Sequence, residues 1–435
     1  MTGRRSPVRA EGPDGACPVG ALGVTRRRFL AGGAAASAGL VAGCGAWSST
    51  DDGGAEATGP QGRAPRRVPF LGAHQNGLTA PVAASGVLCA LDVVAEGRDE
   101  LAETLQAISA EVQRLMEGGA PPETDRIGPP PDNGVLGAEP PVADLSFVLS
   151  VGASLFDERF GLAEARPREL VPMTRLANDR LDDARTHGDL LLAVEGDSPD
   201  ITLASLRQVL RQVRGTTVVR WVVEGHNRAS PSAAAGEAPV RNLLGFKDGT
   251  ANLDASDEAL MDRHVWVGAD DPEPAWAAGG SYQAVRTIRM FVELWDRTSL
   301  VEQEAVIGRH KVSGAPLGGT RETEVPDFSS DPDGEVTPLD AHIRLANPRT
   351  PETEADLILR RGLSYSRGVD GAGRLDQGLA FVSYQRSLRR GFLAVQERLA
   401  GEPLEEYVVP EGGGFFFALP GVVEDGGWLG QGLLA

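Results

Sequence analysis

The chain has 435 residues, of which 41% are hydrophobic, so it can bury a full core in two or three domains. Its formal net charge of −19 argues against nucleic acid and anionic lipid surfaces as partners, because both select basic patches. Its three cysteines, Cys17, Cys44 and Cys89, are too few for a disulfide framework or a zinc cluster.

The N-terminal segment resembles a twin-arginine export signal. Residues 25–30 read TRRRFL, with Arg26 and Arg27 as the pair, and a short apolar run rich in Gly and Ala follows up to Cys44. This run is too short and too weakly apolar to span a membrane. We therefore expect residues 1–44 to be a signal peptide, and the protein to be periplasmic, extracellular or held at the cell surface.

The end of the signal leaves two routes of processing open. Residues 41–44 read VAGC, which is similar to a lipobox, and Cys44 would then carry a lipid anchor. The alternative is cleavage nearby without lipid, for instance after Ala46. Residues 45–67 are rich in Gly, Ser, Asp, Ala and Pro and are expected to form a flexible linker.

Residues 68–225 alternate between strand and helix patterns. In segment 99–116, for example, Leu101, Leu105 and Ile108 recur at the spacing of one helix face. The order is β-α-β-β-α-β, which is that of a ferredoxin-like unit. The predicted strands are 85–95, 144–152, 187–196 and 217–225, and the predicted helices are 99–116 and 198–215.

The same order of elements returns in residues 226–425. The sequence therefore predicts an α+β protein of two ferredoxin-like halves. The long connector 226–282 is expected to be functional, because structured loops of this size usually are. The predicted strands are 283–297, 355–366, 378–385 and 415–421, and the predicted helices are 299–311 and 387–400.

Two short segments could carry chemistry. His342 lies in AHIRLANPR (341–349), where a turn and two arginines suit an axial haem ligand near propionates, although a surface histidine with arginine neighbours fits equally well. Asp248 lies in GFKDGT (245–250), where it either shapes an ordinary Asp-Gly turn or handles a proton. The sequence contains no HExxH, GxSxG or P-loop motif.

Four segments in this order resemble the dye-decolorizing peroxidases, in particular the exported branch that includes the deferrochelatases. The resemblance covers roughly residues 68–425 and implies two ferredoxin-like halves, in a dimeric α+β barrel, around one haem b. The segments are GAHQNGLTAP (72–81), NLLGFKDGTANL (242–253), AHIRLANPR with the following LILRRGLSY (357–365), and LDQGLAFVSYQ (375–385).

The resemblance also implies roles for individual residues. His342 would be the proximal iron ligand and Asp248 the distal acid–base. Arg360 would be the distal arginine, although the neighbouring Arg361 could be mistaken for it, since only one of two successive strand residues faces the haem. Where some members of the family have a distal asparagine, two residues after the arginine, this chain has Gly362.

The remaining implied contacts are with the rest of the cofactor. Arg309, in IGRHK, resembles the family's propionate-binding arginine. Asp376 is the candidate for the carboxylate that accepts the Nδ1–H bond of His342. Further haem contacts are expected from Gly249, Thr250 and Phe381.

The function that the resemblance implies is reduction of H₂O₂ with oxidation of a bulky aromatic reductant. The alternative is a deferrochelatase or haem-handling protein that works with iron-uptake proteins, and a third class is a non-enzymatic binding lipoprotein. A homo-oligomer is the expected assembly. Candidates for relaying electrons to the surface are Tyr365, Tyr384, Trp221 and Trp295, although most aromatic residues at such spacing are core.

Overall fold

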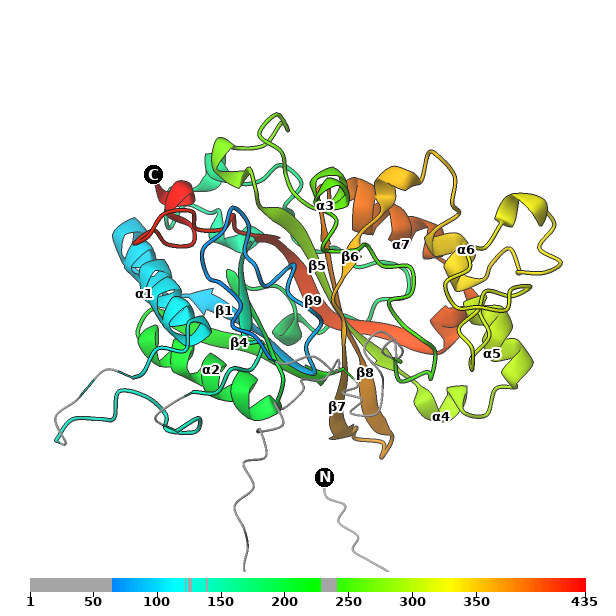
Figure 1. Cartoon of the computed structure of the whole chain (residues 1–435), viewed down its shortest axis with the longest axis horizontal. Coiled ribbons are helices and arrows are strands. Elements are labelled where there is room, and N and C mark those ends of the chain that lie inside the picture. Colours follow the sequence, from blue (N-terminus) through cyan, green and yellow to red (C-terminus); the bar gives the residue numbers. More distant parts are fainter. Residues whose placement is uncertain (1–64, 122, 124–126, 138–139, 228–240) are drawn as a thin grey trace, which may run out of the picture. The chain divides into compact units, whose positions relative to one another are not determined.

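The computed structural model describes residues 65–121, 123, 127–137, 140–227 and 241–435. The expected signal peptide, Cys44 and most of the expected linker lie outside these residues. The described strands form one nine-stranded sheet with the order β5-β9-β2-β3-β1-β4-β7-β8-β6. Because β5 pairs with β8 as well as with β9, the row of strands closes into a barrel (Figure 1). The strands are β1 (Ser85–Val93), β2 (Ser146–Gly152), β3 (Leu190–Gly196), β4 (Thr217–His226), β5 (Ser281–Met290), β6 (Leu359–Arg360), β7 (Leu363–Val369), β8 (Leu375–Gln385) and β9 (Val408–Ala418).

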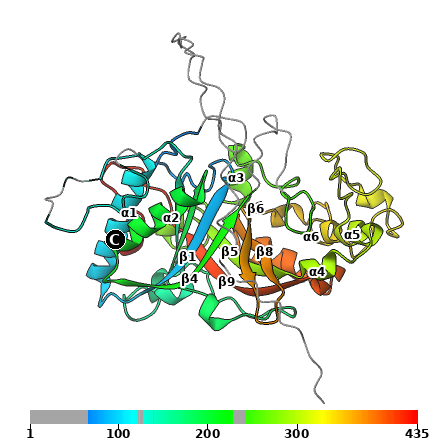
Figure 2. The ribbon, with the colours of Figure 1, turned by 90° about the horizontal axis from the view of Figure 1, so that it is seen from below.

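Each half of the chain has the strand order of a ferredoxin-like unit. In the first half the order is β2-β3-β1-β4, and in the second it is β7-β8-β5-β9, so the α+β architecture with two such halves is confirmed. In both views α1 and α2 lie on one side of the barrel, and α5 and α6 lie on the other (Figures 1 and 2). The helices are α1 (Arg98–Met116), α2 (Pro199–Gln212), α3 (Glu258–His264), α4 (Val292–Trp295), α5 (Leu300–Ile307), α6 (His342–Ala346) and α7 (Ala394–Leu399).

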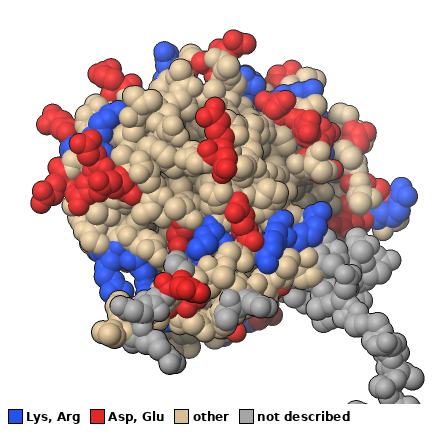
Figure 3. Space-filling model, turned by 60° about the vertical axis from the view of Figure 1, so that its left-hand side comes forward, with Lys and Arg blue, Asp and Glu red and all other residues tan. Residues whose placement is uncertain are grey.

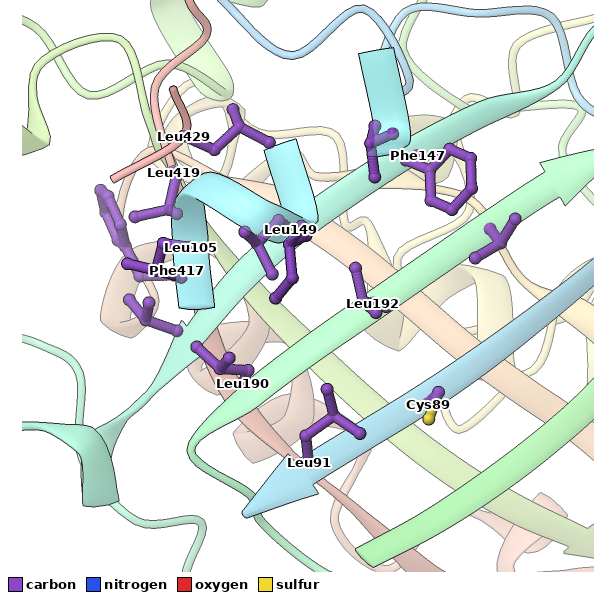
Figure 4. Close-up of a cluster of buried hydrophobic side chains, with 14 of the residues drawn as sticks. Cys89, Leu91, Leu105, Phe147, Leu149, Leu190, Leu192, Phe417, Leu419 and Leu429 are labelled. Carbon is purple, nitrogen blue, oxygen red and sulfur yellow. The ribbon is translucent and has the colours of Figure 1, made fainter. Parts of the chain in front are cut away.

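One core lies between α1 and the sheet. The predicted helix face is buried as expected, and Leu105 packs among leucines of β2 and β3 (Figure 4). Each fully buried leucine contributes about 1.5–3 kcal/mol to folding. Cys89 is part of the same core, and burial raises the pKa of its thiol to about 12, so this cysteine is a packing residue rather than a nucleophile.

Gln75, in segment 72–81, forms side-chain hydrogen bonds to both halves of the chain. β2 and β9 pair over only three residues, and the side chain of Gln75 extends this junction. Its amide nitrogen donates to the carbonyls of Leu149 and Leu419, each at 2.8 Å, and its oxygen accepts from the Leu149 N–H at 2.8 Å. Because the amide is buried, a single unpaired group here would cost about 1–3 kcal/mol.

Three predicted elements of the second half differ from the observed ones. The strand predicted over 283–297 stops at Met290, where its pairing with β9 ends, and the chain turns into α4. The helix predicted over 299–311 stops at Ile307, because Gly308 adopts a left-handed φ of 91°. The strand predicted over 355–366 is two strands, β6 and β7, which pair with successive parts of β8.

The acidic composition is visible on the surface. Figure 3 shows acidic side chains over much of the upper part of one face, and basic side chains gathered in its lower part. The formal charge of −19 is therefore not spread evenly over this face.

Candidate functional site

A cavity of about 560 Å³ lies in the second half, outside the barrel. Ile288 of β5 and Phe381 of β8 line it, whereas Val285 and Val382 of the same strands belong to the barrel interior. Segment 242–251, α6 and the segment around α7 complete its walls. The main apolar lining residues are Ile288, Met290, Ile307, Ile343, Leu357, Ile358, Leu379, Phe381, Phe392, Leu393, Leu399 and Leu404.

Asp248 and Arg360 meet on one wall of this cavity. Nη1 of Arg360 donates to Oδ1 of Asp248 at 2.6 Å, although the two residues are 112 positions apart. Both side chains stay partly exposed, at 31% for Arg360 and 25% for Asp248, so the pair can contact a ligand. Arg361 points the other way: it is buried and pairs with Glu195 of β3. The alternation along β6 therefore places Arg360, and not Arg361, in the cavity.

The residues on either side of Asp248 hold its turn in place through contacts with Glu322. Lys247 forms an ion pair with Glu322, and the Thr250 hydroxyl donates to the same carboxylate at 2.8 Å. Gly249 has a φ of 101°, which side chains rarely allow, whereas a Cβ there would meet no protein atom within 4 Å. The backbone conformation, and not protein crowding, accounts for this glycine.

His342 lies at the start of α6 and faces the same cavity. Its Nδ1 lies 2.7 Å from Oε2 of Glu402, which leaves Nε2 as the ring nitrogen available to a ligand. Glu402 follows α7, and Arg398 of α7 donates to the carbonyls of Leu345 and Ala346 at the end of α6. Segment 398–402 thus holds both the His342 imidazole and the end of α6.

The expectation that Asp376 accepts the His342 bond is wrong. Asp376 pairs with Arg367 at 3.0 Å and is not among the residues that line the cavity. The reason is the alternation of β8: Leu379 and Phe381 face the cavity, and Asp376 has the opposite parity. Glu402 takes the place that was assigned to Asp376.

The charges around His342 set its protonation. Burial lowers the pKa of the imidazole, but the Glu402 carboxylate outweighs burial, and the pKa lies above its ordinary value. The Arg360 guanidinium opposes this effect and Asp248 supports it. All three side chains line the same cavity.

A basic group lies along the cavity near the distal pair. Arg309 is buried, and its Nη1 donates to the carbonyls of Gly314 at 2.7 Å and Glu322 at 3.1 Å. Burial, Arg349 and Arg360 all lower the pKa of Arg309. Arg349 also lines the cavity and has a φ of 61°, which is strained for a residue with a side chain. Three neighbouring cations make this part of the cavity suited to an anionic ligand.

The first half of the chain also reaches the cavity. Asp179 forms a buried ion pair with Arg286 of β5, and both residues belong to the cavity wall. The Arg286 guanidinium lies 5.8 Å from the ring centre of Phe392, another wall residue. This pair fixes the segment around Asp179 beneath the site.

The other predicted site residues divide into two groups. Gly249, Thr250 and Phe381 line the cavity, as does Arg309. The four aromatic relay candidates are buried and do not line it. Of these, Trp295 is joined to the wall, because its Nε1 donates to the carbonyl of Leu244 at 2.9 Å.

Sequence reasoning missed Glu402, Glu322 and Asn252. Glu402 and Glu322 stand in Gly- and Pro-containing loops with no motif around them. Asn252 lies within the segment that resembles the family signature, and it bonds to the backbone of Arg360. The signal that could have pointed to it is its place four residues after Asp248.

Comparison with known families gives two matches that together cover most of the described chain. The family model "Dyp-type peroxidase, N-terminal" matches residues 75–227, and "Dyp-type peroxidase, C-terminal" matches residues 239–423. The two matches fall on either side of segment 228–238.

Individual relatives agree with these matches. The deferrochelatase of Escherichia coli strain K12 is 50% identical over 369 residues, which cover 85% of this chain and 87% of the relative. The structure of ferric DtpA from Streptomyces lividans has a TM-score of 0.77 and 37% identity, covering 85% of this chain and 97% of that chain. A DyP-type peroxidase from Cellulomonas bogoriensis has a TM-score of 0.76 and 33% identity, covering 87% and 99%.

Replacing Glu402 by glutamine should lower the pKa of His342 in the protein prepared without cofactor. The amide removes the negative charge, while burial and Arg360 continue to disfavour the imidazolium. We expect the pKa to fall from above its ordinary value to below it, measured by NMR titration of ¹³C-labelled histidine and assigned with His342→Gln. The control is Glu405→Gln, since the Glu405 carboxylate accepts from the Gly401 N–H and the Nδ1 of His342 is paired with Glu402 instead. An unchanged titration in Glu402→Gln would contradict this account.

Proposed function

The chain belongs to the Dyp-type peroxidase family, and we propose that it reduces H₂O₂ at a haem b held in the cavity between His342 and the Asp248–Arg360 pair. The reductant is a bulky aromatic, dye-like compound. The observation that carries this assignment is the 2.6 Å contact of Asp248 with Arg360 in the same cavity as His342. These groups are the ones that haem peroxide chemistry would need: a nitrogen ligand for the iron, a proton carrier and a fixed cation.

The residues of the cavity fit haem b. His342 offers Nε2 to the iron, because Glu402 occupies its Nδ1 side. The apolar walls suit the porphyrin, and Arg309 and Arg349 are placed to bind its two propionates. Gly249, Thr250 and Phe381 are proposed to contact the ring.

Haem, when bound, supplies the iron that takes up peroxide and the redox chemistry that follows. The Asp248 carboxylate accepts a proton from the peroxide and returns it to the oxygen that leaves as water. Arg360 keeps its charge and stabilises negative charge that develops on the leaving oxygen, an effect worth about 3–4 kcal/mol for one fixed donor. Because Arg360 also holds Asp248, one guanidinium both orients the carboxylate and acts on the peroxide.

Glu402 acts on the opposite side. Its carboxylate accepts the Nδ1–H of His342 and thereby fixes the tautomer and the ring orientation. The negative charge also makes the imidazole a stronger electron donor. Arg398 holds the end of α6, so the imidazole is fixed at both its ring and its helix.

Asp248→Asn and Arg360→Leu should each lower peroxide-driven turnover of an anthraquinone dye while haem is still bound. We expect a loss in kcat of roughly 10²–10⁴-fold for Asp248→Asn, which removes the proton carrier, and roughly 10²–10³-fold for Arg360→Leu, which removes the fixed donor. Turnover is compared at equal Soret absorbance. Asp376→Asn is the matched control, because this carboxylate lies outside the cavity and should leave turnover near that of the unaltered protein. Full activity in both Asp248→Asn and Arg360→Leu would contradict the proposed peroxidase function.

A second candidate function is removal of iron from haem with the porphyrin left intact. The observation that favours it is the 50% identity to proteins named deferrochelatase. The same cavity would serve both activities. Incubation of the purified protein with haem should then release metal-free protoporphyrin, detected by its fluorescence and by mass spectrometry. A heat-denatured sample is the control, and fluorescence no higher than in that sample would rule this activity out.

The cellular location is proposed from the sequence alone. We propose export by the twin-arginine route, with Cys44 as a site of lipid attachment and a homo-oligomer as the assembled state. No helix of the described residues has the length and apolar character to cross a membrane.

Replacing Arg26 and Arg27 by lysine should trap the protein in the cytoplasm, as measured by cell fractionation, whereas lysine at Arg4 and Arg5 should not. Normal export of the Arg26/Arg27 variant would refute the twin-arginine route. Sedimentation velocity of the purified protein tests whether it forms a homo-oligomer.

A further inference from the structure

Asn252 pairs with the backbone of Arg360 as a neighbouring strand would. Its Nδ2 donates to the Arg360 carbonyl at 2.8 Å, and its Oδ1 accepts from the Arg360 N–H at 2.8 Å. β6 has only two residues and pairs with β8 on its other edge. The Asn252 amide therefore supplies both hydrogen bonds on the open edge of β6, at the residue whose side chain enters the cavity.

The segment from Asp248 to Asn252 is short and fixed. The Asn252 N–H donates to the Gly249 carbonyl at 3.0 Å, which closes a turn. Thr250 is held by Glu322 at 2.8 Å, and Leu253 packs against the barrel interior. A displacement of Asn252 relative to Asp248 would have to break this turn.

The opposite side of β6 is equally constrained. The Arg361 N–H donates to the Val382 carbonyl at 2.8 Å, and the Arg361 side chain pairs with Glu195 inside the barrel. The Asp248 carboxylate contacts the Arg360 guanidinium, and the turn 249–252 and the Asn252 amide connect Asp248 to the Arg360 backbone. These contacts together form a closed ring. The Asn252 amide is the link of this ring that joins the turn to the strand.

We propose that Asn252 is a positioning residue that sets the Arg360 guanidinium against Asp248. The inference rests on the proposed function, since it assumes that Arg360 acts on peroxide. Asn252 touches neither the cavity nor its ligand in this account, because it is absent from the cavity wall. Its effect on turnover must therefore pass through Arg360.

The first measurement needs no cofactor and no activity. Hydrogen exchange of the peptide containing residues 359–361, followed by mass spectrometry in the haem-free protein, should be faster in Asn252→Ala, because the Arg360 N–H loses its acceptor. Asn252→Asp keeps that acceptor and should retain most of the protection. The control is Asn76→Ala, whose amide also donates to two backbone carbonyls, those of Pro69 and Leu71, and which should leave residues 359–361 unchanged. Equal exchange in Asn252→Ala and the unaltered protein would overturn the proposal.

The second measurement is a double-mutant cycle on kcat/KM for peroxide, at equal haem occupancy. Asn252→Ala should lower this constant roughly 10–100-fold, because a misplacement of about 1 Å can cost roughly 10²-fold. In the Arg360→Leu background the same change should cost less than about 2-fold, since two residues that act through one group are not additive. An equal loss in both backgrounds would overturn the role of Asn252. Full activity of Arg360→Leu alone would instead overturn the proposed function, so the two failures are distinguishable.

Discussion

The site depends on the rule that successive side chains of a strand point to opposite faces. On β6 this rule sends Arg360 into the cavity, where it meets Asp248, and Arg361 into the barrel, where it meets Glu195. Arg361 is buried and the Glu195 side chain is 14% exposed, and removing one partner of a fully buried pair costs about 3–5 kcal/mol. A slip of one residue would break that pair and remove Arg360 from the site, so the barrel interior enforces the register on which the proposed chemistry relies.

Some charged residues of the cavity wall are paired with one another, and others form a basic group. Asp248 and Arg360 neutralise one another, as do His342 and Glu402 when the imidazole is protonated. Arg309 and Arg349 form a local basic group on the wall, in a protein whose formal charge is −19. This basic group suits the anionic end of a ligand even though the whole molecule repels anions. In the proposed function the same basic group would serve peroxide reduction and iron removal alike.

Local patterns predicted much of the fold, and family resemblance predicted most of the site. The helical spacing of Leu101, Leu105 and Ile108 identified α1, and the order of elements identified both halves. Family resemblance located Asp248, Arg360 and His342. It did not locate Glu402, because this residue meets His342 across 60 positions through the packing of α7 on α6, for which no sequence pattern exists. The resemblance suggested Asp376 in its place, and Asp376 lies outside the cavity because the barrel sets which face of β8 the cavity sees.

The position of β9 in the barrel has a consequence for the order of events during synthesis. β9 spans Val408–Ala418 and follows every other described strand in the sequence, yet it lies between β5 and β2 and joins the two halves. Glu402 comes shortly before β9 in the sequence. A polypeptide still emerging from the ribosome therefore has neither a closed barrel nor a supported imidazole until Glu402 and β9 have been synthesised. One stretch of sequence, residues 402–418, completes both the barrel and the support of His342.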